Sequence, residues 1–310
     1  MISVSIAFMG VLVSLVGDSK FMIWAGMELN TFGFVGLVSV RKSEVASLVK
    51  YVLVQVLGSS AIFLSFMVVL SFSNFSVVDE LGYFLVLVGI MCKLGLFPFH
   101  SWFPSVVASM DWFLLMWLLI IQKLSPLMLM GFMCYDSSVV LCSCLFTSFI
   151  GAVGGLDKTG VKNILAYSSL LNMGWICLCV VGSLPLFLLY FVLYSFQVFS
   201  CLAFLWVVDL KKLSGGVSSE GVILGVLGIS SIPPFMLFFL KLSTVSYFLV
   251  GHSLVVIGLI LSSLLGLSYY VRASVLFLMN SNYYETRVSM FFYMYSFIWI
   301  VVYSVFGILM

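Results

Sequence analysis

The chain is a succession of apolar segments separated by short charged or Gly/Pro-rich breaks. A helix needs about 20 mostly apolar residues to cross the hydrocarbon core of a bilayer. At that depth backbone polar groups must be satisfied internally, which favours helices. We therefore predict an all-α polytopic membrane protein with a single transmembrane domain over residues 1–310. The eleven predicted spans cover residues 2–17, 21–40, 45–72, 81–99, 111–133, 138–154, 163–182, 186–208, 221–248, 254–278 and 290–309.

The composition excludes a soluble protein. Hydrophobic residues make up 64% of the 310, charged residues make up 8%, and the mean hydropathy is +1.29. A soluble core does not need this much apolar surface, and no polar stretch is long enough for an extramembrane domain. The N-terminus lacks the charged region and the small-residue cleavage site of a secretory signal, so Ile2 to Val16 is expected to be retained as the first span.

The cysteines and histidines do not form a pattern typical of a redox centre. Six of the seven cysteines lie inside predicted spans, none forms a C-x-x-C pair, and the histidines are His100 and His252. A bis-histidine haem or a cysteine-ligated iron–sulfur cluster is therefore not expected. We predict no cofactor and no metal site in this chain.

The basic residues of the connections sort to one side of the predicted membrane. If the N-terminus is placed on side A, the even-numbered connections on that side contain Arg41, Lys42, Lys158, Lys162, Lys211, Lys212 and Arg287. The connections on side B contain only Lys20 among basic residues. Because cytoplasmic or matrix loops carry an excess of Lys and Arg, side A is predicted to face the cytosol or the mitochondrial matrix.

Four ionisable residues lie within predicted spans and several residues from their ends: Glu28, Lys93, Lys123 and Lys241. A charge at the bilayer centre costs about 2.5–3.5 kcal/mol on insertion scales, so each is expected to face protein or water. If Lys93 is considered by itself, a purely structural role that holds two helices together is as well supported as proton transfer. The full set of one acid and three bases on four helices favours an internal charge chain, in which Glu28 is the predicted partner of Lys93.

Prolines interrupt two of the lysine-bearing spans. Lys93 is followed by Pro98, and Pro233 with Pro234 precedes Lys241. Proline removes a backbone donor, and the freed carbonyls are tolerated at membrane depth only against protein or water. Two broken helices five spans apart indicate an antiporter-like inverted repeat. Around Lys93 we expect Gly89, Gly95 and Pro98 to loosen the helix. His100, Trp102 and Pro104 are expected to end it.

Several stretches together resemble the subunit 2 family of NADH:ubiquinone oxidoreductase, respiratory complex I. They are WAGMELN at 24–30, KYVLVQVLGSS at 50–60, CKLGLFPFHSWFP at 92–104, QKLSP at 122–126, GGLDKTGVKNILAYSSLLNMGW at 154–175, IPP at 232–234 and YYVR at 269–272. The resemblance implies a proton-translocating, antiporter-like subunit of the membrane arm without a redox centre. It also implies a mitochondrial inner-membrane location, with a matrix N-terminus and an intermembrane-space C-terminus. Expected partners are the other membrane-arm subunits, bilayer lipids and protons, and no nucleic acid.

The resemblance also assigns roles to the four buried ionisable residues. Glu28 matches the family's W-x-G-x-E-x-N glutamate, Lys93 its K-L-G-x-x-P-F-H lysine and Lys123 its Q-K-x-x-P lysine. Lys241 matches the lysine after the double proline. The chain departs from the family pattern at Ser105, Asn163, Asn172, Leu237 and Leu240, and position 172 is not counted as a proton carrier.

Three other readings remain open from the sequence. One is another antiporter-like subunit or a stand-alone cation/proton antiporter, although such relatives usually have more spans. A second is a structural scaffold of the membrane arm, which would not need four intramembrane ionisable groups. A third is a haem- or quinone-binding redox subunit, which would need histidine pairs that the chain lacks.

Overall fold

The computed structural model describes residues 2–17, 19–41, 44–71, 76–133, 138–212, 220–233, 235–249 and 251–280. All regular elements in these ranges are helical. They are α1 (Ile2–Val16), α2 (Lys20–Val40), α3 (Val45–Ser71), α4 (Ser76–Leu94), α5 (Trp102–Ser109), α6 (Trp112–Met116), the π-helical turn η1 (Trp117–Ile121), α7 (Gln122–Met133), α8 (Ser138–Leu156), α9 (Val161–Gly182), α10 (Leu184–Lys212), α11 (Glu220–Ile229), α12 (Met236–Phe248) and α13 (Ser253–Asn280).

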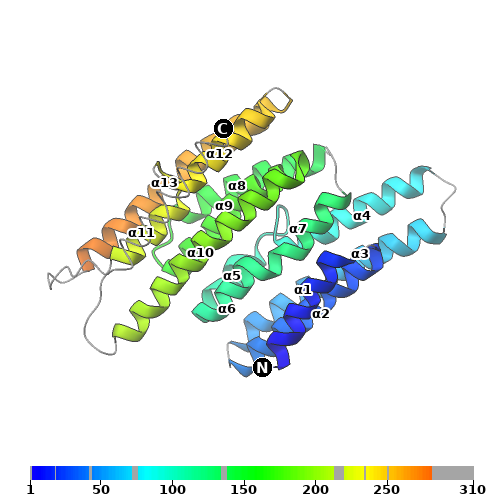
Figure 1. The fold of residues 1–310 in the computed structure, drawn as a ribbon, viewed down its shortest axis with the longest axis horizontal. Helices are drawn as coiled ribbons and strands as arrows, with labels where there is room; N and C mark the ends of the chain where they lie inside the picture. The colour runs from blue at the N-terminus through cyan, green and yellow to red at the C-terminus, as the bar shows by residue number, and fades with distance from the viewer. Residues whose placement is uncertain are drawn as a thin grey trace.

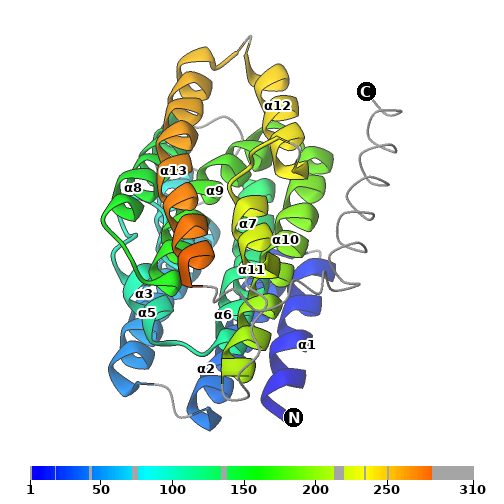
Figure 2. The same cartoon turned by 90° about the vertical axis from the view of Figure 1, so that its left-hand side faces the viewer.

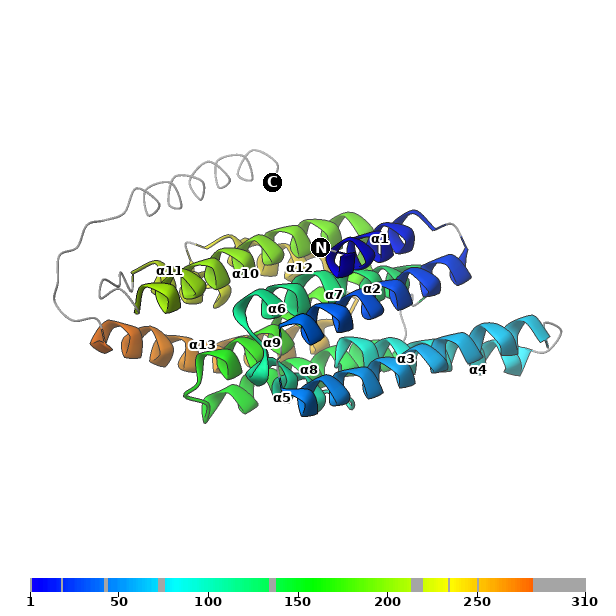
Figure 3. The same ribbon diagram turned by 90° about the horizontal axis from the view of Figure 1, so that it is seen from below.

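The helices run roughly parallel in one bundle, with α1–α4 at one edge and α11–α13 at the opposite edge (Figure 1). Neighbours in the chain pack against each other, α1 along α2, α3 along α4 and α8 along α9. Figure 3 shows α3 and α4 extending side by side past the other helices. The middle of the bundle is occupied by α9 (Figure 2), which is buried along almost its whole length. An apolar helix without a polar face is expected at such a central position.

Seven helices of the described part are long and apolar enough to cross a membrane. They cover Lys20–Val40, Val45–Val69, Trp112–Met133, Ser138–Leu156, Val161–Gly182, Leu184–Val207 and Ser253–Phe277. Two shorter apolar helices, Ile2–Val16 and Met236–Phe248, occupy further predicted positions. The prediction of an all-α polytopic fold is confirmed. The predicted span 290–309 lies outside the described residues.

Both helices predicted to be discontinuous are broken. The first break separates α4, which ends at Leu94, from α5, which begins at Trp102. The second separates α11, which ends at Ile229, from α12, which begins at Met236. Each break contains a residue in the left-handed region, Gly95 at φ 69° and Ser231 at φ 59°. A right-handed helix cannot continue through such a residue, so both breaks follow from the local backbone.

Four details of the predicted break near Lys93 were wrong. The helix ends at Leu94, before His100, and Trp102 and Pro104 lie in the first turn of α5. Proline fits there because the N–H groups of a first turn have no partner within the helix. Gly89 does not loosen α4, which is continuous there. It permits close packing, since a Cβ at Gly89 would lie 2.6 Å from the carbonyl oxygen of Gly58 on α3.

Basic residues at one end of the bundle contact neighbouring connections at the same end. The Lys162 ammonium donates a hydrogen bond to the Met110 carbonyl at 2.7 Å, and the Arg272 guanidinium donates to the Lys158 carbonyl at 2.8 Å. The Arg41 guanidinium lies 4.9 Å from the Phe113 ring centre. These contacts bring Arg41, Lys162 and Arg272 to connections at one end of the bundle, as the span count requires. Lys42 and Arg287 lie outside the described residues.

Candidate proton-transfer site

The site is built around the C-terminal end of α4. Lys93 lies in the last turn of this helix, one residue before it ends. Beyond it the Leu96 amide donates to the Met91 carbonyl at 3.0 Å, which closes the turn through Gly95. The carbonyl groups at a helix C-terminus carry partial negative charge, which favours a cation there. The break in the helix therefore places Lys93 at a helix end inside the bundle, where a positive charge is favoured.

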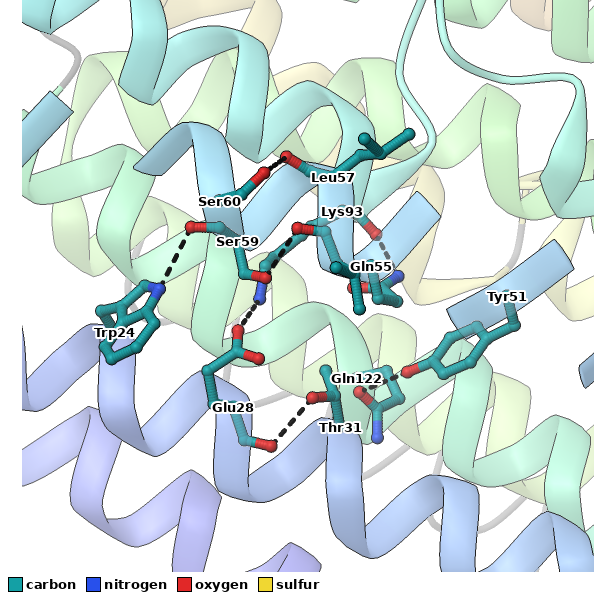
Figure 4. A network of polar contacts seen from close by, with 11 residues as sticks. Trp24, Glu28, Thr31, Tyr51, Gln55, Leu57, Ser59, Ser60, Lys93 and Gln122 are labelled. Carbon is teal, nitrogen blue, oxygen red and sulfur yellow. Dashed lines mark hydrogen bonds and ion pairs between the residues drawn. The ribbon is translucent and has the colours of Figure 1, made fainter. Parts of the chain in front are cut away.

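Glu28 of α2 is the direct partner of this ammonium. The Lys93 Nζ donates to the Glu28 Oε1 at 2.8 Å (Figure 4). The side chain of Lys93 is 1% exposed and that of Glu28 is 20% exposed. This is the one ion pair found among the described residues. The predicted contact between Glu28 and Lys93 is thereby confirmed, and their role in proton transfer stays a prediction.

Two glycines allow α3 and α4 to approach each other beside this pair. A Cβ at Gly58 would lie 2.8 Å from the Lys93 Cγ and 2.9 Å from the Gly89 carbonyl oxygen. Real Cβ atoms essentially never come this close to another heavy atom, so a larger residue would force the helices apart. The stem of Lys93 is therefore enclosed by helix backbone, and its ammonium is directed toward α2.

Hydrogen bonds connect this pair to α7 through α3. The Gln55 amide donates to the Lys93 carbonyl at 3.2 Å, and the Tyr51 hydroxyl donates to the Gln122 Oε1 at 3.1 Å (Figure 4). The Gln122 Nε2 in turn donates to the Asn30 Oδ1 at 3.1 Å. Asn30, Tyr51, Gln55 and Gln122 all lie in the stretches that carry the family resemblance, but no site role was predicted for any of them.

Lys123 lies one residue beyond Gln122 and is 3% exposed. Its ammonium makes no hydrogen bond within the described ranges. It lies 5.1 Å from the Phe103 ring centre and 5.8 Å from that of Tyr194. Aromatic faces attract cations weakly, so the rings partly replace the missing hydrogen bonds. The π-helical turn Trp117–Ile121 comes directly before this segment, and Pro126 lies inside α7.

Lys241 lies on α12, after the second break, and is 8% exposed. It lines a cavity of about 350 Å³ together with Trp175, Ser230 and Ser231. Its ammonium lies 5.4 Å from the Trp175 ring centre. A cavity of this size has room for several water molecules beside the lysine.

The structure therefore brings two of the four predicted site residues into contact, Glu28 and Lys93. Lys123 and Lys241 are each buried apart from that pair, and within the described part of the chain neither has a carboxylate partner. Sequence reasoning did not single out Tyr190 or Tyr194, whose buried hydroxyls have no hydrogen-bond partner among the described residues. Tyr194 is the residue whose ring centre lies 5.8 Å from the Lys123 ammonium. Tyrosine is common in apolar helices, so no sequence signal distinguishes these two. The Oδ1 of Asn172, which was not counted as a proton carrier, also lacks a partner in the described part of the chain.

Comparison with known proteins identifies the family. The family model described as NADH:quinone oxidoreductase/Mrp antiporter, TM, matches residues 18–266. The chain belongs to this family. The match includes all four predicted site residues and both broken helices.

Curated relatives place the chain more closely within the antiporter family. NADH-ubiquinone oxidoreductase chain 2 of Branchiostoma lanceolatum is 34% identical over 293 residues, covering 88% of this chain and 84% of that protein. The protein of the same name from Mytilus edulis is 31% identical over 276 residues, covering 87% and 84%. The predicted resemblance to the subunit 2 family is confirmed.

Solved structures of low sequence identity share the fold. A chain of respiratory complex I from Thermus thermophilus with bound aureothin aligns with a TM-score of 0.76 at 16% identity, covering 88% of this chain and 69% of that chain. A chain of the Mrp complex from Dietzia sp. DQ12-45-1b aligns with a TM-score of 0.75 at 19% identity, covering 87% and 59%. The antiporter-like helix arrangement is therefore common to all three.

Proposed function

We propose that this chain is a proton-translocating, non-redox subunit in the membrane arm of NADH:ubiquinone oxidoreductase. Its partners would be the other membrane-arm subunits and the lipids of the mitochondrial inner membrane, with the N-terminus in the matrix and the C-terminus in the intermembrane space. The curated relatives named as chain 2 of that enzyme support the assignment. The chemistry of quinone reduction would lie in other subunits, and this chain would need no cofactor.

The buried Glu28–Lys93 pair is the observation that carries the proposal. A lysine holds or releases a proton according to its surroundings, and a nearby carboxylate stabilises its charged form. Movement of Glu28 relative to Lys93 would therefore change how strongly Lys93 holds its proton. Moving one charge across the membrane requires about 2.3 kcal/mol per 100 mV. A change of one unit in a pKa corresponds to about 1.36 kcal/mol, so a change of two units is sufficient at that potential.

Lys123 and Lys241 are the further carriers in this proposal. Each is a basic side chain buried without a fixed carboxylate partner in the described structure. Such a group can accept a proton from one neighbour and pass it to another, because no strong ion pair holds it in one state. The cavity beside Lys241 would supply water to that step.

Native gel electrophoresis tests the subunit assignment. The chain should comigrate with a large assembly that oxidises NADH, whereas a stand-alone antiporter would migrate elsewhere. Substitution of the four site residues then distinguishes a proton carrier from a scaffold. If the chain is a proton carrier, the ratio of protons pumped to electrons transferred should fall. If it is only a scaffold, this ratio should be unchanged in every variant that assembles.

A further inference from the structure

Gln122 uses both ends of its amide to join three helices. Its Oε1 accepts a hydrogen bond from the Tyr51 hydroxyl of α3 at 3.1 Å. Its Nε2 donates to the Asn30 Oδ1 of α2 at 3.1 Å and lies 3.4 Å from the Asn30 carbonyl oxygen. Figure 4 shows the Gln122 side chain directed toward the Tyr51 hydroxyl. The amide is thus fixed in orientation, because its oxygen and its nitrogen each have a partner.

Both partners of Gln122 lead back to the ion pair. Asn30 follows Glu28 by two residues on α2, so any movement of this part of α2 moves both. Tyr51 lies one helical turn before Gln55 on α3, and Gln55 donates to the Lys93 carbonyl at 3.2 Å. The network therefore touches the α2 segment that bears Glu28 and the α4 turn that bears Lys93.

The other end of the network is Lys123, the next residue along α7. The π-helical turn Trp117–Ile121 ends immediately before Gln122. The backbone N–H of Gln122 donates a hydrogen bond to the Trp117 carbonyl and so continues the turn. Such a turn shifts the residues that follow it relative to a regular helix and is frequent at functional sites. The side-chain bonds of Gln122 hold α7 in register at this irregular point. They therefore bear on the backbone from which the Lys123 side chain extends.

The members of the network suit a positional role better than proton transfer. Asparagine and glutamine amides donate and accept hydrogen bonds but do not ionise at physiological pH. Asn30 is 2% exposed and Tyr51 is fully buried, so breaking these bonds leaves polar groups without water. A buried polar group without a partner is unfavourable, so these bonds favour the observed register of the three helices.

We propose that Gln122 is a positioning residue that couples the state of the Glu28–Lys93 pair to Lys123, with Tyr51 and Asn30 as its anchors. When Glu28 separates from Lys93, the displacement of α2 passes through Asn30 to Gln122 and changes the surroundings of Lys123. This inference rests on the proposed function, since it assumes that the pair and Lys123 exchange charge.

The test is the substitution Gln122→Met in the assembled complex, which keeps the side-chain length and removes both hydrogen bonds. We expect a lower proton-to-electron ratio and a changed pH profile of coupled turnover. In the double variant with Glu28→Gln, the loss in the proton-to-electron ratio should be smaller than the sum of the two single losses, because both residues would act on one coupled unit. A merely structural role would reduce the amount of assembled complex and leave the pH profile of the remainder unchanged.

The matched control is Gln197→Met on α10. The Gln197 amide is also buried and donates to the Gly225 carbonyl at 3.2 Å, far along the chain from the ion pair. This control should leave the ratio and the pH profile of the assembled complex unchanged. If Gln122→Met prevents assembly, Tyr51→Phe replaces it, because it removes a single hydroxyl and preserves the ring. Tyr51→Phe should then lower the ratio in the same direction.

An unchanged ratio and pH profile in Gln122→Met, or in Tyr51→Phe where it is the substitute, would overturn the inference. Strict additivity with Glu28→Gln would overturn it as well. If Lys93→Ala and Lys123→Met lower the ratio while the Gln122 variant does not, only the coupling role is lost and the proposed function stands. If those lysine variants also pump normally, the proposed function itself fails.

Discussion

The ammonium of Lys93 and the carboxylate of Glu28 meet at 2.8 Å, although 65 positions separate them in the chain. The break of α4 places Lys93 at a helix end, and the glycine contact between α3 and α4 encloses its stem. Removal of one partner from a fully buried ion pair costs about 3–5 kcal/mol, and the partial exposure of the Glu28 side chain, 20%, lowers that cost here. The pair is therefore both a structural contact and the part of the site most sensitive to substitution.

Glu28→Gln should lower coupled turnover and the proton-to-electron ratio, because an amide cannot stabilise a charged Lys93 as a carboxylate does. The variant and a Lys20→Ala control are compared by proton uptake and NADH oxidation in the same vesicles. Lys20 is exposed at the start of α2, so its removal should have little effect on either quantity. Equal pumping by Glu28→Gln and Lys20→Ala would contradict the role of the pair.

Lys123→Met should lower the proton-to-electron ratio without destabilising the protein. The ammonium makes no hydrogen bond in the described structure, and methionine fills a similar volume without a polar head group. Replacing even a buried ion pair by apolar residues of similar volume is often neutral or stabilising by about 1–4 kcal/mol, and among the described residues Lys123 has no ion pair to lose. Thermal unfolding of the purified complex should therefore occur at the same temperature or higher. A marked drop in that temperature would show that Lys123 serves the fold.

Gly95→Ala should destabilise the chain by about 1–2 kcal/mol, because an L-residue at φ 69° brings its Cβ too close to the following carbonyl. The new Cβ would also lie 3.3 Å from the Phe103 Cβ. The measurement is the thermal unfolding temperature of the assembled complex. Gly251→Ala is the control, since a Cβ there meets nothing within 4 Å. Equal unfolding temperatures for the two variants would mean that the turn after α4 does not need glycine.

Cysteine labelling tests the predicted orientation. Thr159 and Gly251 are exposed and lie in connections that the span count places on sides A and B, respectively. The outer membrane is made permeable and the inner membrane is kept intact. An impermeant thiol reagent should then label Gly251→Cys. It should label Thr159→Cys only after the inner membrane is opened. Labelling of both from the same face would show that the span count is wrong.

The sequence predicted the positions of the long helices because apolar runs of bilayer length leave few alternatives. It also predicted both breaks, since Gly95, Pro98 and Pro233 interrupt otherwise apolar helices. The short helix α5 was missed because its first residues, Trp102 and Pro104, were interpreted as helix-ending signals.

Partners on other helices could not be predicted with the same certainty. Glu28 was paired with Lys93 because a buried base needs an acid, and the contact confirms this chemical argument. Nothing in the periodicity of α3 or α7 distinguishes Tyr51 or Gln122 from other residues that face the bundle interior. Their network depends on the register between three helices, which side-chain packing determines. The π-helical turn before Gln122 has the same origin and no sequence signal of its own.

The most direct test of the central claim is the proton-to-electron ratio of assembled complex that contains Lys93→Ala. The substitution removes an insertion penalty, so the chain should still enter the membrane and assemble. We predict that coupled turnover falls and that fewer protons are pumped for each electron pair delivered to quinone. Assembled complex with wild-type NADH:quinone turnover and an unchanged ratio would contradict the account.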